Sequence, residues 1–277
     1  MSLLAAIASS RRRSSVAYDA DAASYFAAVE AVSSISATAK NAANALIAGL
    51  KAASLWTLIH QLYLYAGPDT LAGALVKAKG SGTRVNNGFV SGDFSSILGL
   101  QGNGTSKSIT NGFLTNGFSS LSHSIFVYSS AGLPTSPPDS FLFGSYNNTG
   151  NGSLLLDAYN TSFGGARAFR SGGALSLSFS AFFTSDLLAS GSVMGARTGS
   201  TISKIYQNGA LKNTNSNPAT PAFSSLDFSS FCVNSNGVLG GFSPDRRQVE
   251  IFAQGLNDTQ AQQLHDLTTA YVNALNA

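Results

Sequence analysis

Between Gly80 and Gly255 the sequence is a succession of short apolar runs separated by loops rich in Gly, Asn, Ser and Pro. The clearest run is Ala174–Phe183, in which Leu, Phe and Ala alternate with Ser. A period of two predicts a strand with one face in a core and one face towards water. Many short strands joined by such loops predict an antiparallel sandwich. Further strands are expected at Leu121–Tyr128, Phe141–Tyr146, Ile202–Gln207, Ala210–Lys212, Leu226–Val233 and Gln248–Ala253.

One turn in this region is unusually well defined. Within Lys204–Lys212 (KIYQNGALK), Asn208-Gly209 lies between apolar flanks. This dipeptide is the strongest short-range signal for a two-residue hairpin. The sequence therefore predicts two strands that pair Tyr206 with Leu211.

The chain before residue 80 has a different character, because Tyr18–Val76 is rich in Ala and has helical periodicity. An apolar stripe begins at Phe26, Val29, Val32 and Ile35 and continues at Leu46, Ile47 and Leu50. A second helical run is expected at Leu55–Tyr65, ended by Gly67-Pro68, and a short third segment at Asp69–Lys77. Either this region packs on the sandwich, or the stripe formed by Phe26, Val29, Val32 and Ile35 is an interface with other copies or other proteins.

The chain is expected to close with a helix. Asn257 and Gln260 have the spacing of a capping box. An apolar stripe follows at Leu264, Leu267, Tyr271 and Leu275. The predicted organisation is thus an arm (1–18), a helical attachment or packing region (19–79), and a β-sandwich with its closing helix (80–277).

Charged residues make up only 10% of the chain, against about 25% in typical soluble domains. The formal charge is +3, and outside the run Arg11, Arg12 and Arg13 the balance is neutral. Because no basic stripe with interleaved aromatic residues exists, no nucleic-acid partner is expected. The arginine run is either a short arm that contacts an acidic partner or a solvated tail.

A single cysteine, Cys232, excludes an intrachain disulfide and any site with several cysteines. It lies in an apolar run, so a buried thiol is expected, and no metal or cofactor is expected. The first residues lack the pattern of a secretory signal, and no apolar stretch is long enough to span a bilayer. A phage particle would reconcile synthesis in a cytosol with an extracellular type of composition, because phages leave the cell by lysis.

Two groups of residues resemble known proteins. Gln248–Gln260 (QVEIFAQGLNDTQ), followed by a short helix, resembles the last strand and exit of concanavalin A-like (laminin-G-like) jelly-roll domains, and KIYQNGALK resembles their preceding hairpin. The second group resembles phage and prophage structural proteins, common in cyanobacterial phages, that join a helical N-terminal part to a concanavalin A-like domain. It comprises Asp19–Ala31 (DADAASYFAAVEA), Leu50-Lys51, Leu55-Trp56, Ala66–Val76, Phe89–Phe94 and Gly99–Lys107. The resemblance implies a jelly-roll sandwich in a virion component and carries over no functional residue.

Glucanases of this fold hydrolyse glycosides with two carboxylates on one strand face. The chain has only two glutamates, Glu30 and Glu250, and its β region has no pair of acidic residues two positions apart. The histidines His60, His123 and His265 lie in three different predicted elements. No catalytic residue is therefore predicted, and the protein is expected not to be an enzyme.

Binding is the remaining activity. Tyr rings and Asn amides in Gly-rich loops suit the faces and hydroxyls of sugars. The alternative is ordinary turn chemistry, which needs the same residue types. The candidate glycan-binding residues are Tyr146, Asn147, Asn148, Tyr159 and Asn160.

The sequence thus favours a non-enzymatic structural protein at the surface of a phage virion. It would be a fibre, tail or baseplate component that displays a lectin-like sandwich to host glycans. A capsid decoration (cement) protein is the alternative within this class, and a carbohydrate-active hydrolase or a free bacterial lectin lies outside it. The expected partners are other virion proteins, further copies of the chain and a host surface glycan, without insertion into a membrane.

Overall fold

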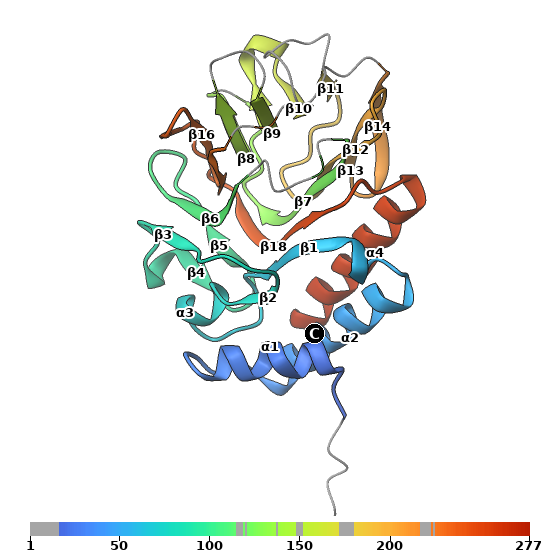
Figure 1. The fold of residues 1–277 in the computed structure, drawn as a ribbon. Coiled ribbons are helices and arrows are strands. Elements are labelled where there is room, and N and C mark those ends of the chain that lie inside the picture. The colour runs from blue at the N-terminus through green and yellow to red at the C-terminus, as the bar shows by residue number, and fades with distance from the viewer. Residues whose placement is uncertain are drawn as a thin grey trace, which may run out of the picture.

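The computed structural model describes residues 17–114, 119, 121–136, 138–147, 152–171, 180–216, 223 and 225–277. Within them, two sheets pack face to face, and helices cover the outer face of one sheet (Figure 1). All the described strand pairs are antiparallel except one, between β8 and β16. The prediction of a mainly β, antiparallel sandwich is confirmed.

The first sheet lies next to the helices. Its strand order is β14 (Ala210–Asn215), β13 (Ser203–Gln207), β12 (Gly191–Thr198), β7 (Ser122–Ala131), β18 (Arg246–Ala253), β1 (Ile59–Leu64) and β2 (Lys77–Lys79). β5 (Gly99–Gln101) also pairs with β18 and with β4 (Phe94–Ser95).

The second sheet forms the opposite layer. Its order is β11 (Ser180–Phe183), β10 (Ala166–Ser171), β9 (Gly152–Asn160), β8 (Ser140–Asn147), β15 (Asp227–Ser230), β6 (Ser108–Leu114) and β3 (Val85–Asn87). β16 (Val233–Ser235) pairs with β8 and with β17 (Val238–Gly240).

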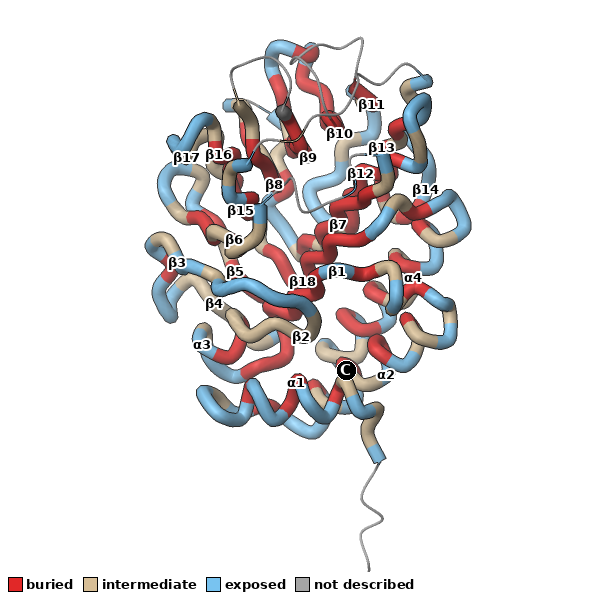
Figure 2. Tube along the Cα trace, in the orientation of Figure 1, coloured by how far each residue is buried: buried red, intermediate tan, exposed pale blue. Residues whose placement is uncertain are grey.

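The inner faces of both sheets form one apolar core. At its centre the ring of Phe252 lies edge-on to those of Phe143 and Phe228, with ring centroids 5.2 Å apart in each pair. Such edge-to-face pairs add to the free energy gained by burying the rings. Figure 2 shows the buried residues concentrated in these strands and on the helix faces that meet the first sheet.

A second core lies between the first sheet and the helices α1 (Ala20–Glu30), α2 (Ala37–Ala52) and α4 (Asp258–Leu275). Phe26, Val29 and Ile35 are buried in it, whereas Val32 is 54% exposed. For the first three residues the structure therefore supports packing within the chain, and their proposed role as an interface must be corrected. The physical reason is that the outer face of the first sheet is itself apolar and must be covered.

The predicted helix at Leu55–Tyr65 is wrong. The chain makes a single 3₁₀ turn at Trp56–Leu58 and then enters β1, which pairs with β18 on one side and β2 on the other. A short apolar run does not distinguish a buried strand from a buried helix, and β1 is buried along most of its length. Because β1 lies inside the first sheet, residues 19–79 contribute to the sandwich as well as to the helical layer.

Other local predictions are confirmed. Asn208 and Gly209 have φ of 50° and 75°, and the hairpin pairs Tyr206 with Leu211. In α4, the Gln260 N–H donates to Asn257 Oδ1 and the Asn257 N–H to Gln260 Oε1, each at 3.0 Å. The third segment predicted at Asp69–Lys77 is confirmed only in part: the helix α3 spans Leu71–Ala74 and starts after Thr70, whose Oγ1 accepts from the N–H of Gly73, and Lys77 already belongs to β2. None of the described helices is both long enough and apolar enough to cross a membrane.

Some predictions fall outside the described residues. Arg11, Arg12, Arg13 and Asn148 are among these. The strand predicted at Ala174–Phe183 is described only in its last part, as β11.

Candidate functional site

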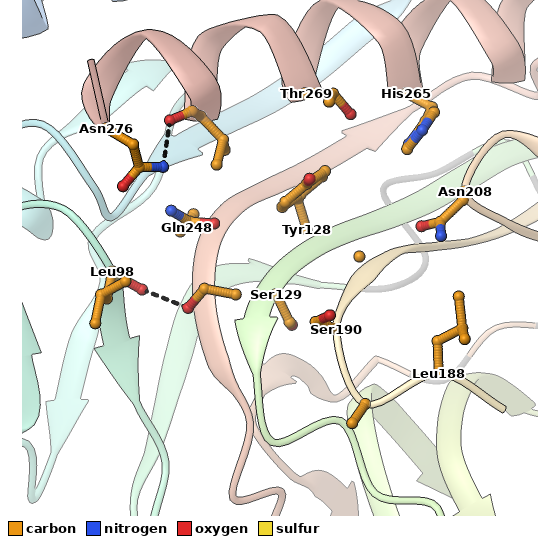
Figure 3. A pocket seen from close by; sticks show the side chains of 14 residues that line it. Leu98, Tyr128, Ser129, Leu188, Ser190, Asn208, Gln248, His265, Thr269 and Asn276 are labelled. Carbon is orange, nitrogen blue, oxygen red and sulfur yellow. Dashed lines mark hydrogen bonds between the residues drawn. The ribbon is translucent and has the colours of Figure 1, made fainter.

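A groove of about 590 Å³ runs between α4 and the outer face of the first sheet (Figure 3). Strand β7 and strand β18 form its floor, and α4 forms one wall. The segment before β12 and the Asn208-Gly209 turn close the other side, and Leu98 lies at one end. The lining residues from the strands and the helix are Tyr128, Ser129, Ser130, Gln248, His265, Thr269, Val272 and Asn276.

Two irregularities in the sheet place polar side chains on the floor. Arg246 pairs with Ala131 and Arg247 with Ser129, so Ser130 is an extra residue on β7. Val249 then pairs with Tyr128, so Gln248 is an extra residue on β18. Such bulges re-aim side chains and are common beside functional sites.

The side chains of both extra residues, Ser130 and Gln248, are hydrogen-bonded to the neighbouring carbonyls of Leu98 and Ile97. Ser130 Oγ donates to the carbonyl of Leu98 at 3.0 Å, and Gln248 Nε2 donates to the carbonyl of Ile97 at 2.8 Å. These bonds leave Gln248 Oε1 without a hydrogen-bond partner although the residue is only 1% exposed. A buried acceptor in this state costs free energy until a donor reaches it.

The opposite side of the groove is held by Ser192. Its N–H donates to Asn208 Oδ1 at 2.8 Å, and its Oγ lies 2.9 Å from His265 Nδ1. The turn and α4 are thus fixed relative to each other. The rings of His265 and Tyr128 stack with centroids 6.3 Å apart and planes 17° apart, so the lining includes one aromatic pair.

The groove is uncharged. None of the fourteen lining residues is Asp, Glu, Lys or Arg. Burial lowers the pKa of His265, so its imidazole is neutral in neutral solution. Thr269 Oγ1 adds a second buried polar atom without a partner. The site therefore offers hydroxyls, amides and one aromatic pair to a neutral ligand.

The predicted glycan-binding residues do not form one site. Tyr146 pairs with Ser153 near the turn between β8 and β9, whereas Tyr159 pairs with Ser140 at the other end of that hairpin. Six residues along a strand span about 20 Å. Asn160 is buried, and its Nδ2 donates to Asp157 Oδ2 at 3.1 Å. Asn147 ends β8 beside the same turn as Tyr146.

The histidines are dispersed, as their positions in the sequence indicate. His123 is fully buried, with Nδ1 3.0 Å from the carbonyl of Ser119 and Nε2 2.8 Å from Ser171 Oγ. Burial lowers its pKa to about 3, so the ring is neutral. His60 lies on an exposed part of β1. Within the described residues, no three His, Cys, Asp or Glu side chains are grouped as metal ligands.

Glu250 belongs to the core between the sheets. Its carboxylate accepts from Arg247 Nη1 at 2.7 Å, Tyr65 OH at 2.8 Å and Ser230 Oγ at 2.9 Å. It has no exposed surface, so it cannot reach a polysaccharide. Cys232 is likewise buried, and burial raises the pKa of its thiol to about 12.

Sequence reasoning found Asn208 as a turn residue but missed the groove. Its floor depends on bulges in two strands that are far apart in the sequence, and neither bulge has a local signal. The position of His265 in the predicted closing helix does not indicate that its side chain faces this groove.

No family model matches the sequence, and no curated protein matches it. Among solved structures, the chain is similar to a sialidase of Trypanosoma rangeli, a mutant with trans-sialidase activity (TM-score 0.48, 13% identity, 85% of this chain and 38% of that one). It is also similar to the binding domain of botulinum neurotoxin serotype D (TM-score 0.46, 12% identity, 76% of this chain and 51% of that one). A third similar structure is domain 4 of an extracellular arabinanase from Geobacillus stearothermophilus, in complex with arabinotriose (TM-score 0.45, 13% identity, 75% of this chain and 99% of that one). The chain spans about half or less of the sialidase and neurotoxin chains.

Proposed function

We propose that the protein is a non-enzymatic, lectin-like sandwich of the concanavalin A-like type that binds an uncharged oligosaccharide in the groove beside α4. The observation that carries this proposal is the uncharged lining, which combines a stacked Tyr128–His265 pair with the unpaired acceptor Gln248 Oε1. Two antiparallel sheets of similar size support the fold type.

The chemistry of a sugar matches this lining. A pyranose has an apolar face that packs on aromatic rings and a rim of hydroxyls that donate and accept hydrogen bonds. A sugar hydroxyl that donates to Gln248 Oε1 would satisfy a buried group that folding leaves unpaired. Because the site holds no fixed charge, it gives no advantage to an anionic ligand.

The absence of a carboxylate pair at the groove supports the non-enzymatic part of the proposal. Glycoside hydrolysis by the common mechanisms requires two carboxyl groups on either side of the scissile bond. None of the described lining residues is acidic. Glu250, the only glutamate in the β region, is occupied in the core.

We further propose that the protein belongs to the surface of a phage particle, as a fibre, tail or baseplate component. This part rests on the resemblance of Asp19–Lys107 to phage structural proteins and on the low charge of the chain. Electron microscopy of labelled particles tests it. Label on the tail is expected, label on the head lattice would favour a capsid decoration protein, and absence from purified virions would contradict both.

The binding part is tested with an array of neutral glycans, followed by calorimetric titration of the best ligand. Thr269→Val keeps the side-chain volume and removes Oγ1, and Gln248→Met removes Oε1. Each variant should weaken binding about tenfold, because one hydrogen bond to a buried group contributes about 1.4 kcal/mol. Asn273→Ala, on the exposed face of the same helix, is the matched control and should bind as the wild type does.

Three outcomes would overturn the proposal. Failure of every neutral glycan to bind, or equal binding by Thr269→Val, Gln248→Met and the wild type, would remove the groove as the site. Release of reducing ends from a bound polysaccharide would show that the protein is an enzyme.

A further inference from the structure

A second pocket, of about 420 Å³, lies among three loops of the sandwich. One loop joins β5 to β6, the next joins β7 to β8, and the third precedes β18. Its lining differs from that of the groove because proline rings and one phenylalanine dominate it. The described lining residues are Asn103, Gly104, Thr105, Pro134, Ser136, Pro138, Ser140, Phe242 and Pro244.

The walls of this pocket are preformed. Asn103 Oδ1 accepts from the N–H groups of Thr105, Ser106 and Lys107 at 2.9–3.0 Å, which fixes the first loop. Gly104, with φ of 72°, lies beside Pro244, and a Cβ added to it would be in ordinary van der Waals contact with that ring, at 3.4 Å. A rigid site loses little conformational entropy when it binds a ligand.

The segment that leads into β8 is fixed as well. Asp139 Oδ1 accepts from both the N–H and the Oγ1 of Thr161, each at 2.6 Å. Pro138 and Ser140 lie on either side of Asp139, so this anchor holds two lining residues in place.

Ser140 provides the second, independent observation. It is 2% exposed, and its Oγ has no hydrogen-bond partner. An unsatisfied buried hydroxyl in a native structure requires an explanation such as a water or a ligand. The rings of the prolines and of Phe242 offer only carbon surface. Ser140 Oγ is the one buried side-chain polar atom without a partner among the described lining residues, and Thr105 and Ser136 are exposed.

We propose that this pocket is a second binding site, specific for a neutral N-acetylated sugar. The acetamido methyl group would pack against Phe242 and the proline rings, and the acetamido carbonyl would accept a hydrogen bond from Ser140 Oγ. The sugar hydroxyls would remain at the rim beside Thr105 and Ser136.

The chemistry of the walls decides between this ligand and a plain hexose. A hydroxyl pressed against proline and phenylalanine carbons would lose its water without gaining a partner, which costs about 1–3 kcal/mol. A methyl group in the same place gains from burial. Because none of the described lining residues is charged, the site does not favour an acidic sugar.

Saturation-transfer NMR on the full-length protein tests the proposal with N-acetylglucosamine, N-acetylgalactosamine and glucose as probes. The acetamido methyl protons should receive the strongest saturation, and glucose should receive little. Ser140→Ala should weaken binding about fivefold to tenfold, and Phe242→Ala should do so independently, which covers the case in which one variant fails to fold. Asn273→Ala, at an exposed position of α4 that lines neither site, should leave these signals unchanged.

Glucose binding as strongly as the acetylated sugars, absence of signal from all three, or unchanged binding by both pocket variants would each overturn the proposal. The groove variant Thr269→Val distinguishes this site from the groove. Loss of neutral glycan binding in that variant, with retained binding of N-acetylglucosamine, would show two independent sites.

Discussion

The guanidinium of Arg167 donates to Gln207 Oε1 at 2.7 Å and so joins β10 of the second sheet to β13 of the first. The same guanidinium has no acidic partner within bonding distance among the described ion pairs. It donates instead to the carbonyl of Ala158 and, through Nη2, to those of Pro134 and Leu188. Pro134 lines the second pocket and Leu188 lines the groove, so one buried side chain supports both sites.

Replacing this side chain should therefore affect stability and binding together. Arg167→Met removes the donor to the buried carbonyl of Ala158, the donor to the part-buried carbonyls of Pro134 and Leu188, and one of the two donors to Gln207 Oε1. Each buried group left unsatisfied costs about 1–3 kcal/mol. We expect a loss of at least about 3 kcal/mol in the free energy of unfolding, measured in urea. Arg167→Lys should rescue little, because an ammonium cannot reproduce the planar fork of donors. Lys212→Met, on exposed β14, is the control and should change stability by less than about 0.5 kcal/mol.

His123 should make the protein sensitive to mild acid. Its pKa is about 3 in the folded protein, against about 6.5 in an unfolded chain. Below about pH 6.5 the unfolded chain binds a proton that the folded chain does not bind, so stability falls as the pH falls, by about 1.4 kcal/mol per unit. Between about pH 6.5 and about pH 5, the wild type should lose about 2 kcal/mol more than His123→Gln.

Comparing the wild type with His123→Gln isolates the titration of the His123 imidazole, because the carboxylates and the other histidines titrate in both proteins. Urea unfolding at the two pH values gives the difference. An identical pH dependence in the wild type and His123→Gln would contradict the prediction, and so would an imidazole of His123 that titrates near pH 6 in NMR spectra.

Local signals predicted much of this fold. The Asn208-Gly209 turn and the capping box of α4 depend on interactions between residues close in sequence, and these were found. Several strands, such as β9, β10 and β12, were not predicted. β1 was missed because its identity depends on pairing with β18, almost two hundred residues away, which replaces the helical pattern suggested by its neighbours.

The candidate site was harder to predict because it too depends on contacts between residues that are distant in the sequence. The pair formed by Tyr128 and His265 joins a strand to a helix, and Gln248 faces the groove only because β18 carries an extra residue there. The loops that suggested sugar binding instead placed Tyr146 and Tyr159 at opposite ends of a hairpin. Composition identified polar loop residues, but only strand register shows which of them meet.

Glu250 should be a structural residue. Glu250→Gln removes the charge that faces Arg247 and leaves a fully buried cation with one acid partner, Asp245. Breaking a buried ion pair from one side typically costs about 3–5 kcal/mol. We expect a loss of this order in chemical unfolding. Asp69→Asn, at an exposed carboxylate, is the control, and unchanged stability of Glu250→Gln would contradict the structural role.

The capping box should contribute measurably to α4. Asn257→Ala removes the acceptor for the Gln260 N–H and should cost about 1 kcal/mol. Asn273→Ala, in the exposed interior of the same helix, should be neutral or slightly stabilising because Ala has the higher helix propensity. The two variants are compared by thermal unfolding followed by circular dichroism. Equal melting temperatures would show that the cap adds nothing to the stability of the folded protein.

The edge between β14 and β11 should resist pairing with other chains. Asn213 Nδ2 donates to the carbonyl of Phe182 at 2.5 Å, and Asn215 Nδ2 donates to that of Ser180 at 3.1 Å. These side chains occupy carbonyls on an edge strand, which would otherwise be a template for strand addition. The double variant Asn213→Ala/Asn215→Ala should therefore form larger species than the wild type in sedimentation-velocity runs at increasing concentration. Thr214→Ala, at the exposed position between the two asparagines, is the matched control. Equal sedimentation of all three proteins would show that the amides do not protect this edge.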